Sequence, residues 1–278
     1  MGNVRRVEEQ TDHYGISTGP RALQAWATQA LSFDAPGWEK DFRQALRAGL
    51  TGLSAADGVM TVGFWDGRQR VKDLENAVMY NVGLAQFSPF LAAAGLHFLR
   101  RPEPFLEPRE LPAGPVLAHY DYTVEPVEGS VVTNPLEVLE LAFQLPGTSN
   151  VRDVWRQVRL ALHNREAQDW SSTRLGLRVE TPTALAAGAV KPLLDGIVAG
   201  LHTVQDDGTT AAVLRRWGAP DDELRLCQQG AAPLGPRRLI TLIGGRPAWN
   251  PADDLFAEIT LRRGQRSGRY DVTLYPIA

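Results

Sequence analysis

The chain has 278 residues, 29 basic and 32 acidic side chains, and a formal net charge of −3 at neutral pH. This length allows one large domain or two ordinary ones, and the balanced charge gives no global sign of a nucleic-acid partner, although it leaves room for a local basic surface. The single cysteine, Cys227, excludes an intrachain disulfide and any multi-cysteine metal site, which is typical of a reducing compartment.

The beginning of the sequence, MGNVRRVEEQ, is charged and is not followed by an apolar stretch. A membrane-spanning helix requires about 18 or more apolar residues in a row, and we find no such segment. We therefore expect neither a signal peptide nor a membrane anchor, and we expect a cytoplasmic protein.

The first part of the chain alternates between helical and strand-like patterns. Between Gly19 and Leu50, apolar residues recur at helical spacing, which predicts two helices separated by Pro36-Gly37. A run of β-branched and aromatic residues between two Asp-Gly turns predicts a strand from Val59 to Trp65. A further helix is expected from Asp73, because acidic and amide residues there suit a helix N-terminus.

The remaining elements follow from the same signals of periodicity, capping and turns. In chain order we predict a Pro-rich loop over 101–115, a strand over 116–124, a helix over 151–164 with Asn150 as N-cap, a strand over 174–179, a helix over 182–202, and strands over 238–243, 255–261 and 270–275. The last two strands are expected to form a hairpin through Gly264 to Gly268.

These elements predict an α/β (α+β) fold of two related αβ units, each a small mixed sheet flanked by helices. We place the first unit, with an acidic strand-to-helix junction, at residues 1–130. The second, at residues 131–278, ends in the hairpin. Because each half offers a strand, a polar junction and an apolar helix, a tandem duplication that forms a fused pseudo-dimer is one interpretation.

The segment RQRVKDLENAVMY, residues 68–80, is the main candidate for chemistry. Asp73 and Glu75 are two residues apart, and their carboxylates converge if Asp73 ends an extended stretch and Glu75 begins the helix. Two convergent carboxylates are a common way to hold Mg²⁺ beside a substrate phosphate. The alternative is a solvated junction with helix-capping acids.

Basic residues precede these acids. Arg68, Arg70 and Lys72 alternate, so in an extended chain their side chains would share one face. Such a face could offset the charge of a phosphate backbone.

The acidic segment resembles the signature of the RusA family of crossover-junction endonucleases. That signature has a basic residue or proline, then Asp-x-Asp-Asn, a lysine on the next turn and an aspartate pair after the helix. Asp73, Glu75 and Asn76 match the acids and the asparagine, with Glu in place of one Asp. Met79 occupies the lysine position, and no Asp or Glu lies between Ala77 and Pro102. The resemblance implies acids that bind Mg²⁺ and a dimer that cuts branched DNA.

The missing parts of that signature occur in the second half of the chain. Lys191 and Asp195 lie four apart on a helix that is followed by Asp206-Asp207, yet Leu185 and Ala187 stand where the family has its acidic pair. Each half thus holds a different part of the signature, as in a degenerate duplication. Without the resemblance, Lys191 and Asp195 are an ordinary i,i+4 pair and the two aspartates belong to a turn.

A third candidate is the pair His119 and Asp121, which would project from the same face of a strand. Such a pair could bind a metal or move protons, but it lacks a third ligand. The alternative is structural hydrogen bonding. A small-molecule enzyme with a pocket around His119 and Asp121 is also an open class of function, although no motif supports it.

Two other functions have more support in the sequence. The first is a Mg²⁺-dependent nuclease, intact or catalytically degenerate, that acts on branched or structured DNA. Its predicted residues are Asp73, Glu75, Asp207 and Lys191 for catalysis, Asp73 and Glu75 for the metal, and Arg68, Arg70, Lys72 and Asn76 for substrate binding. The second is a non-enzymatic interaction subunit, a pseudoenzyme within a nucleic-acid-processing or defence complex, with protein partners.

Overall fold

The computed structural model divides the chain into two compact units. It describes residues 7–34, 36–69, 73–107, 109–126, 138–145, 150–166, 169–205, 208–226, 228–265 and 268–277. Unit 1 comprises Met1–Asn134, Ala184–Ala187 and Phe256–Arg263, and unit 2 comprises Pro135–Thr183, Gly188–Leu255 and Gly264–Ala278. Strands and helices occur together in both units, so the predicted mixed α/β class is confirmed.

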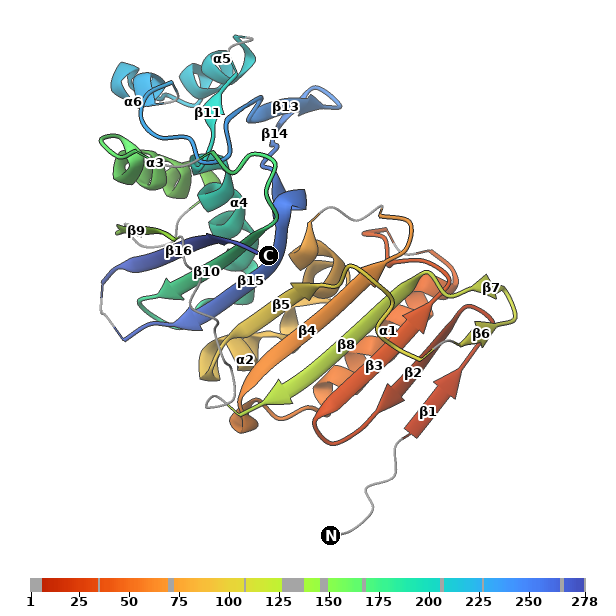
Figure 1. Ribbon diagram of the computed structural model, residues 1–278. Helices are drawn as coiled ribbons and strands as arrows, with labels where there is room; N and C mark the ends of the chain where they lie inside the picture. Colours follow the sequence, from red (N-terminus) through yellow and green to blue (C-terminus); the bar gives the residue numbers. More distant parts are fainter. Residues whose placement is uncertain are drawn as a thin grey trace. The chain divides into compact units, whose positions relative to one another are not determined.

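Unit 1 is built on a mixed β-sheet with the strand order β1-β2-β3-β8-β4-β5-β15 (Figure 1). Strands β4 and β5 run parallel, and the other neighbouring pairs run antiparallel. The strands are β1 (Val7–Gln10), β2 (Tyr14–Thr18), β3 (Ala22–Ala27), β4 (Val59–Asp66), β5 (Leu96–Arg100), β8 (Ala118–Glu125) and β15 (Phe256–Arg263). The C-terminal part of the chain therefore contributes β15 to the sheet of unit 1.

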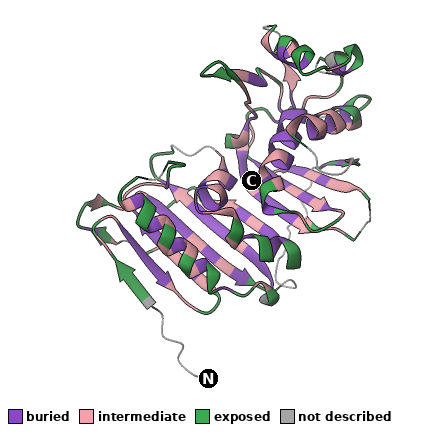
Figure 2. Ribbon diagram, turned by 180° about the vertical axis from the view of Figure 1, so that it is seen from behind, coloured by how far each residue is buried: buried purple, intermediate pink, exposed green. Residues whose placement is uncertain are grey.

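One face of this sheet is covered by helices. Helix α1 (Trp38–Thr51) packs against β2 and β3, and the short α2 (Ser88–Ala93) packs against β4 and β15. Figure 2 shows α1 lying across the buried strands with its exposed residues turned outward. The buried apolar side chains of α1, Phe42, Leu46 and Leu50, are spaced four residues apart and form one stripe. Turns η1 (Ala55–Asp57) and η3 (Leu84–Gln86) complete the connections on this side.

The other face of the sheet is crossed by the segment that follows β5 (Figure 1). This segment contains the short paired strands β6 (Glu110–Leu111) and β7 (Gly114–Pro115). Residues on this face of β8 are His119 and Asp121, because Tyr120 and Tyr122 point to the helix-covered core. His119 and Asp121 therefore share a face of β8, as the alternation of side chains along a strand predicts.

Unit 2 has a smaller antiparallel sheet with the order β10-β16-β9. Its strands are β9 (Leu139–Phe143), β10 (Leu175–Thr181) and β16 (Tyr270–Pro276), and its two central helices are α3 (Val151–Leu162) and α4 (Val190–Gly200). The helices pack closely, since a Cβ atom at Gly196 would lie 2.5 Å from the Cβ of Val154. The short turns η5 (Ala187–Ala189) and η6 (Asp253–Leu255) precede α4 and β15.

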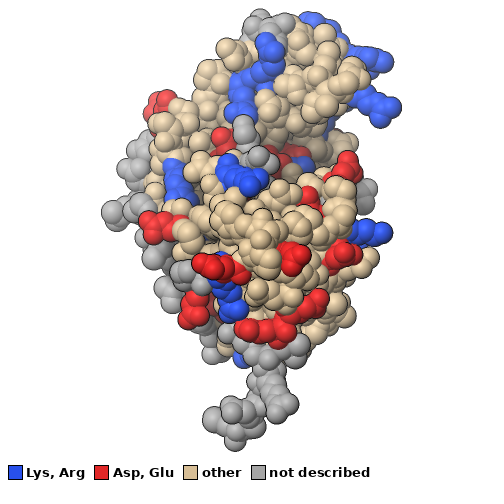
Figure 3. Space-filling view, turned by 90° about the vertical axis from the view of Figure 1, so that its right-hand side faces the viewer, with Lys and Arg blue, Asp and Glu red and all other residues tan. Residues whose placement is uncertain are grey.

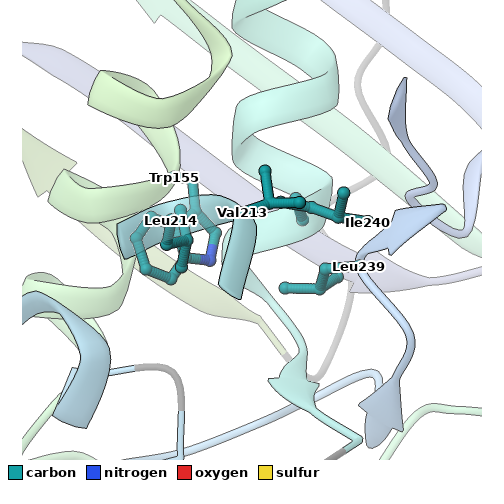
Figure 4. Close-up of a cluster of buried hydrophobic side chains, with 6 residues drawn as sticks. Trp155, Val213, Leu214, Leu239 and Ile240 are labelled. Carbon is teal, nitrogen blue, oxygen red and sulfur yellow. The ribbon is translucent and has the colours of Figure 1, made fainter. Parts of the chain in front are cut away.

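A second layer of unit 2 consists of short elements packed on α3 and α4. They are α5 (Thr209–Arg216), α6 (Asp221–Leu226), the parallel pair β11 (Thr203–Val204) and β12 (Pro236–Arg237), and the hairpin of β13 (Ile240–Ile243) and β14 (Arg246–Trp249). A hydrophobic cluster joins them, with Trp155 and Ala199 from α3 and α4, Val213 and Leu214 from α5, and Leu239 and Ile240 at β13 (Figure 4).

Several predicted elements are confirmed. The strands at 59–65, 116–124 and 174–179 form as β4, β8 and β10, and the predicted helix after Asn150 forms as α3. The side chain of Asn150 accepts a hydrogen bond from Asp153 N–H at 3.1 Å, as an N-cap should.

Two predictions were wrong. Residues 22–27 form strand β3 instead of a helix, because β2 and β8 pair with it on both edges. The expected C-terminal hairpin is not formed, because β16 is paired with β10 on one edge and with β9 on the other.

Candidate functional site

The acidic junction of unit 1 begins where β4 ends. Asp66 closes the turn after β4 by accepting a hydrogen bond from Arg68 N–H at 3.0 Å. The side chain of Arg68 is exposed. The other two basic residues proposed to bind substrate, Arg70 and Lys72, lie outside the described residues, so their common face stays a prediction.

Asp73 and Asn76 lie in contact at the start of a helical segment. The amide Nδ2 of Asn76 donates to Asp73 Oδ2, and the carbonyl of Asp73 accepts from Ala77 N–H at 3.2 Å. The next residues form a π-helix, η2 (Asn76–Tyr80), in which Asn81 N–H donates to the Asn76 carbonyl. This is the geometry of a helix-starting Asp. Short π-helical turns are also frequent at functional sites.

Glu75 differs from Asp73 in its access to solvent. Only 2% of Glu75 is exposed, whereas Asp73 is half-buried. Met79, at the place of the family's lysine, is fully buried in the core of unit 1. Of the predicted metal ligands, Asp73 is therefore the one carboxylate that water can reach.

The predicted second site lies in unit 2, and its lysine already forms an ion pair. Lys191 Nζ and Asp195 Oδ1 form an ion pair at 3.0 Å along α4, and 8% of Asp195 is exposed. This pair matches the alternative reading of an i,i+4 helical interaction. Asp207 lies outside the described residues.

The described part of the chain contains no group of three or more His, Cys, Asp or Glu side chains arranged to hold a metal ion. A group of this size is not required for Mg²⁺, which is often bound by one or two carboxylates with water completing the octahedron. The Mg²⁺ site at Asp73 and Glu75 stays a prediction.

His119 is held by hydrogen bonds from the backbone. Its Nδ1 accepts from Phe105 N–H at 3.3 Å and from Leu106 N–H at 3.2 Å. Burial lowers the pKa of His119 to about 4, which keeps the ring neutral at pH 7. The ring therefore ties the segment after β5 to the sheet, which is the structural alternative considered for this residue.

The sequence did not point to the most exposed apolar feature of unit 2. Strands β13 and β14 are joined by Gly244-Gly245 with φ of 56° and 78°, which is the positive-φ pair that a type I′ hairpin turn requires. Just before the turn, 58% of Leu242 and 68% of Ile243 are exposed. These two apolar side chains are therefore open to solvent at the hairpin tip, one on each face of the hairpin, because successive side chains of a strand alternate in direction.

Aromatic residues continue this feature toward α5. The ring of Trp249, which pairs with Ile240, lies 6.0 Å from the ring of Trp155 and 6.2 Å from that of Trp217. Trp155 is fully buried, and 38% of Trp217 is exposed. A row of tryptophans thus runs from the core of unit 2 to its surface.

Arginines border this apolar surface. Arg215 and Arg216 end α5 directly before Trp217, and Arg246 is paired with Ile243 in the hairpin. Residues 209–250 contain six arginines and three acidic residues, so this part of the chain is basic although the whole is not. In the space-filling view, Lys and Arg side chains gather at the upper end, where Figure 1 draws α5 and the hairpin (Figure 3).

We call this group of residues the hairpin surface. It consists of Trp217, Leu242 and Ile243 with Arg215, Arg216 and Arg246. The signal that could have located it is the Gly-Gly dipeptide after two apolar residues, which predicts a tight hairpin with an apolar tip.

Comparison with known proteins adds no family assignment: the chain matches neither any protein-family model nor any curated protein. In the described part of the chain, no helix combines the length and the apolar character that crossing a membrane requires.

Proposed function

We propose that the chain is a non-enzymatic interaction protein that binds a partner protein through the hairpin surface. The observation that carries this proposal is the exposure of Leu242 and Ile243 at the tip of a hairpin. Apolar side chains rimmed by polar residues are typical of protein-binding surfaces, and Trp and Arg are enriched among the residues that dominate binding energy. The hairpin surface contains both types.

The charge of the surface specifies the partner. Exposed arginines at positions 215, 216 and 246 favour an acidic partner segment, because complementary charge speeds association and fixes orientation. Strands β13 and β14 form a two-stranded sheet of their own, so an extended acidic segment with apolar side chains can pair along a hairpin edge. The partner is therefore an acidic, partly extended protein segment.

This proposal fits the second function considered from the sequence, a subunit of a nucleic-acid-processing or defence complex. The local RusA-like signature supports that setting. The incomplete signature also supports a fold without chemistry, since Met79 is in the core and Glu75 is almost fully buried.

The test is affinity purification from cells that naturally produce the protein. We compare the unaltered chain with the double variant Leu242→Asp and Ile243→Asp, and with Leu160→Asp as control, because Leu160 is a 44% exposed leucine on α3 of the same unit. We expect one protein to co-purify in stoichiometric amount with the unaltered chain and the control but not with the double variant. Co-purification that is equal in all three samples, or seen in none, contradicts the proposal.

Two further measurements identify the occupant. Analytical ultracentrifugation of the pure chain detects self-association, and a dimer that the double variant abolishes would mean that a second copy, not a different protein, covers the surface. Recovery of nucleic acid instead of protein would likewise overturn the proposed partner class. An acidic partner also predicts that the complex weakens as salt rises, because screening reduces interactions between exposed charges.

As a second candidate, we propose a Mg²⁺-dependent nuclease with its centre at Asp73. One observation favours it: Asp73 and Asn76, two residues of the family signature, lie in contact at the start of a π-helical turn. In this proposal Asp73 and Glu75 hold the metal. The substrate is bound by Arg68, Arg70, Lys72 and Asn76, and Lys191 with Asp207 belongs to a second, incomplete site. The bound ion would stabilise charge that develops on a phosphate.

The nuclease candidate is tested with purified protein, Mg²⁺, and junction, flap and single-stranded DNA. Cleavage by the unaltered chain that Asp73→Ala abolishes and Asp195→Ala retains would support it. If none of the three substrates is cleaved in Mg²⁺ or Mn²⁺, this candidate is wrong and the interaction proposal is unaffected.

A further inference from the structure

Unit 1 contains a pocket of about 540 Å³ between its open sheet face and the segment after β5. Its walls are mainly apolar and include Trp65 of β4 together with Leu106, Leu111 and Val116 of the crossing segment. The polar side chains that the following argument uses are His119 and Arg109. A mostly apolar hollow with a few directed polar groups is the usual form of a small-molecule site.

The aromatic wall of this pocket is fixed in place. Trp65 and His119 are opposite each other on β4 and β8, and their ring centroids lie 4.9 Å apart. The two backbone hydrogen bonds to His119 Nδ1 leave that nitrogen without a proton, so the neutral ring carries its proton on Nε2. This face of the sheet thus presents the ring of Trp65, a tilted histidine ring beside it and a preset hydrogen-bond donor.

The cationic side of the pocket is also held in position. The guanidinium of Arg109 lies over the ring of Trp26, 3.9 Å from its centroid. Trp26 is itself fixed over Gly15, where a Cβ atom would come within 2.2 Å of the indole. Stacking on tryptophan orients the planar guanidinium without consuming its in-plane N–H donors.

Two acidic residues near Arg109 do not cancel its charge. Glu8 accepts from Arg109 at 3.4 Å, and its side chain is 52% exposed, which describes a weak surface pair. Glu110 also lines the pocket but is exposed to solvent. A ligand carboxylate that binds Arg109 inside the pocket is less screened than the surface pair with Glu8 and can use the bidentate geometry of the guanidinium.

We propose that this pocket binds a small planar aromatic carboxylate, with its ring against Trp65 and its carboxylate on Arg109. The apolar walls favour the ring, and the oriented guanidinium selects the anion over a neutral analogue. Nε2–H of His119 supplies a donor for a polar atom on the ring. This site is in unit 1 and does not depend on the function proposed for the hairpin surface.

The test uses a fluorescent aromatic anion, 1-anilinonaphthalene-8-sulfonate, and its displacement by indole-3-acetate and by the matched neutral alcohol, indole-3-ethanol. We expect saturable binding of the probe and at least tenfold stronger displacement by the acid than by the alcohol. Arg109→Gln should remove this preference for the acid, whereas Arg109→Lys should retain part of it. Arg263→Gln is the control, because Arg263 is an exposed arginine of the same unit.

Several outcomes contradict the proposal. They are no displacement by the acid, equal displacement by acid and alcohol, or an unchanged preference in Arg109→Gln. If Arg109→Gln does not fold, as judged by circular dichroism, the comparison of acid with alcohol on the unaltered chain and on Arg109→Lys decides the matter. If acid and alcohol displace the probe from Trp65→Leu as they do from the unaltered chain, the ligand binds elsewhere and the assignment is also overturned.

Discussion

Arg152 of α3 and Glu223 of α6 form a two-pronged ion pair, with Nε to Oε1 at 2.6 Å and Nη2 to Oε2 at 3.0 Å. Arg152 Nη1 also donates to the carbonyl of Trp217 at 2.8 Å. Hydrogen bonding to Glu223 raises the pKa of the Arg152 guanidinium. The pair therefore connects the core of unit 2 to the backbone beneath the exposed Trp217 of the hairpin surface.

Loss of this ion pair should lower the stability of unit 2 and of the hairpin surface that the pair supports. Glu223 is 2% exposed, so Glu223→Gln leaves Arg152 with a neutral partner in a poorly solvated position. We expect the free energy of unfolding to fall by about 1–3 kcal/mol. Chemical denaturation measures this, with Asp222→Asn, an exposed neighbour on α6, as the control that should change stability by less than about 0.5 kcal/mol. Equal effects of the two substitutions would contradict the account.

The stability of unit 2 should depend more on Arg159 than on any other single side chain. It is fully buried, and it donates to the carbonyls of Gly200 at 3.2 Å, Leu226 at 3.0 Å and Ala231 at 2.7 Å, and to that of Gln229. These carbonyls include the ends of α4 and α6, where negative partial charge favours a cation.

We expect Arg159→Met to lower the free energy of unfolding by about 3 kcal/mol or more, because several buried carbonyls lose their donors. Arg156→Met is the matched control on the same helix. The Arg156 side chain is 40% exposed and lies 3.9 Å from Glu223, so its loss should cost less than about 1 kcal/mol. A destabilisation of Arg159→Met no larger than that of the control would show that the carbonyl cluster is not important for stability.

His202 predicts a pH dependence of stability. Only 2% of His202 is exposed, its Nδ1 is 3.1 Å from the Gly235 carbonyl, and its Nε2 has no hydrogen-bond partner among the described residues. Burial, with a smaller effect from the positive charges of Arg237 and Arg159, lowers its pKa to about 4 from an ordinary value of 6.5. The folded state therefore resists protonation that the unfolded state accepts.

The sign follows from the two pKa values. Above pH 6.5 both states hold a neutral ring; between pH 6.5 and about 4 only the unfolded state gains a proton, so stability falls as the pH falls. Between pH 7 and pH 5 we expect the free energy of unfolding of the unaltered chain to fall by about 2 kcal/mol more than that of His202→Gln, whose side chain cannot titrate. Urea unfolding at the two pH values checks this. Identical losses would mean that His202 is protonated in the folded state.

The strands and helices that the sequence predicted correctly are those with strong local signals. α3 has a capping residue at Asn150 and an acidic partner at Asp153, and β4 lies between two Asp-Gly turns. Residues 22–27 were misread because Ala, Leu and Gln favour helices in isolation. Pairing of β3 with β2 and β8 outweighed that preference, which is an effect of tertiary context that a local pattern does not contain.

The candidate sites were predictable only in part. The contact of Asp73 with Asn76 follows from a three-residue spacing on a helical turn, but the burial of Glu75 depends on how the turn packs on the sheet. The hairpin surface was missed because α5 packs on β13 and the ring of Trp217 lies near that of Trp249 in the hairpin, although the two residues are distant in sequence. Long-range contacts of this kind are not visible in residue spacing.

The central claim is that the hairpin surface binds a protein partner, and site-specific photocrosslinking tests it most directly. A photoreactive amino acid is placed at Ile243 or, as a control, at Leu160, and the chain is irradiated in the cells that produce it. The account predicts a crosslink to one acidic protein from position 243 and none from position 160. Crosslinks of equal yield at both positions, or no crosslink from 243 in cells where the control protein is equally abundant, would contradict it.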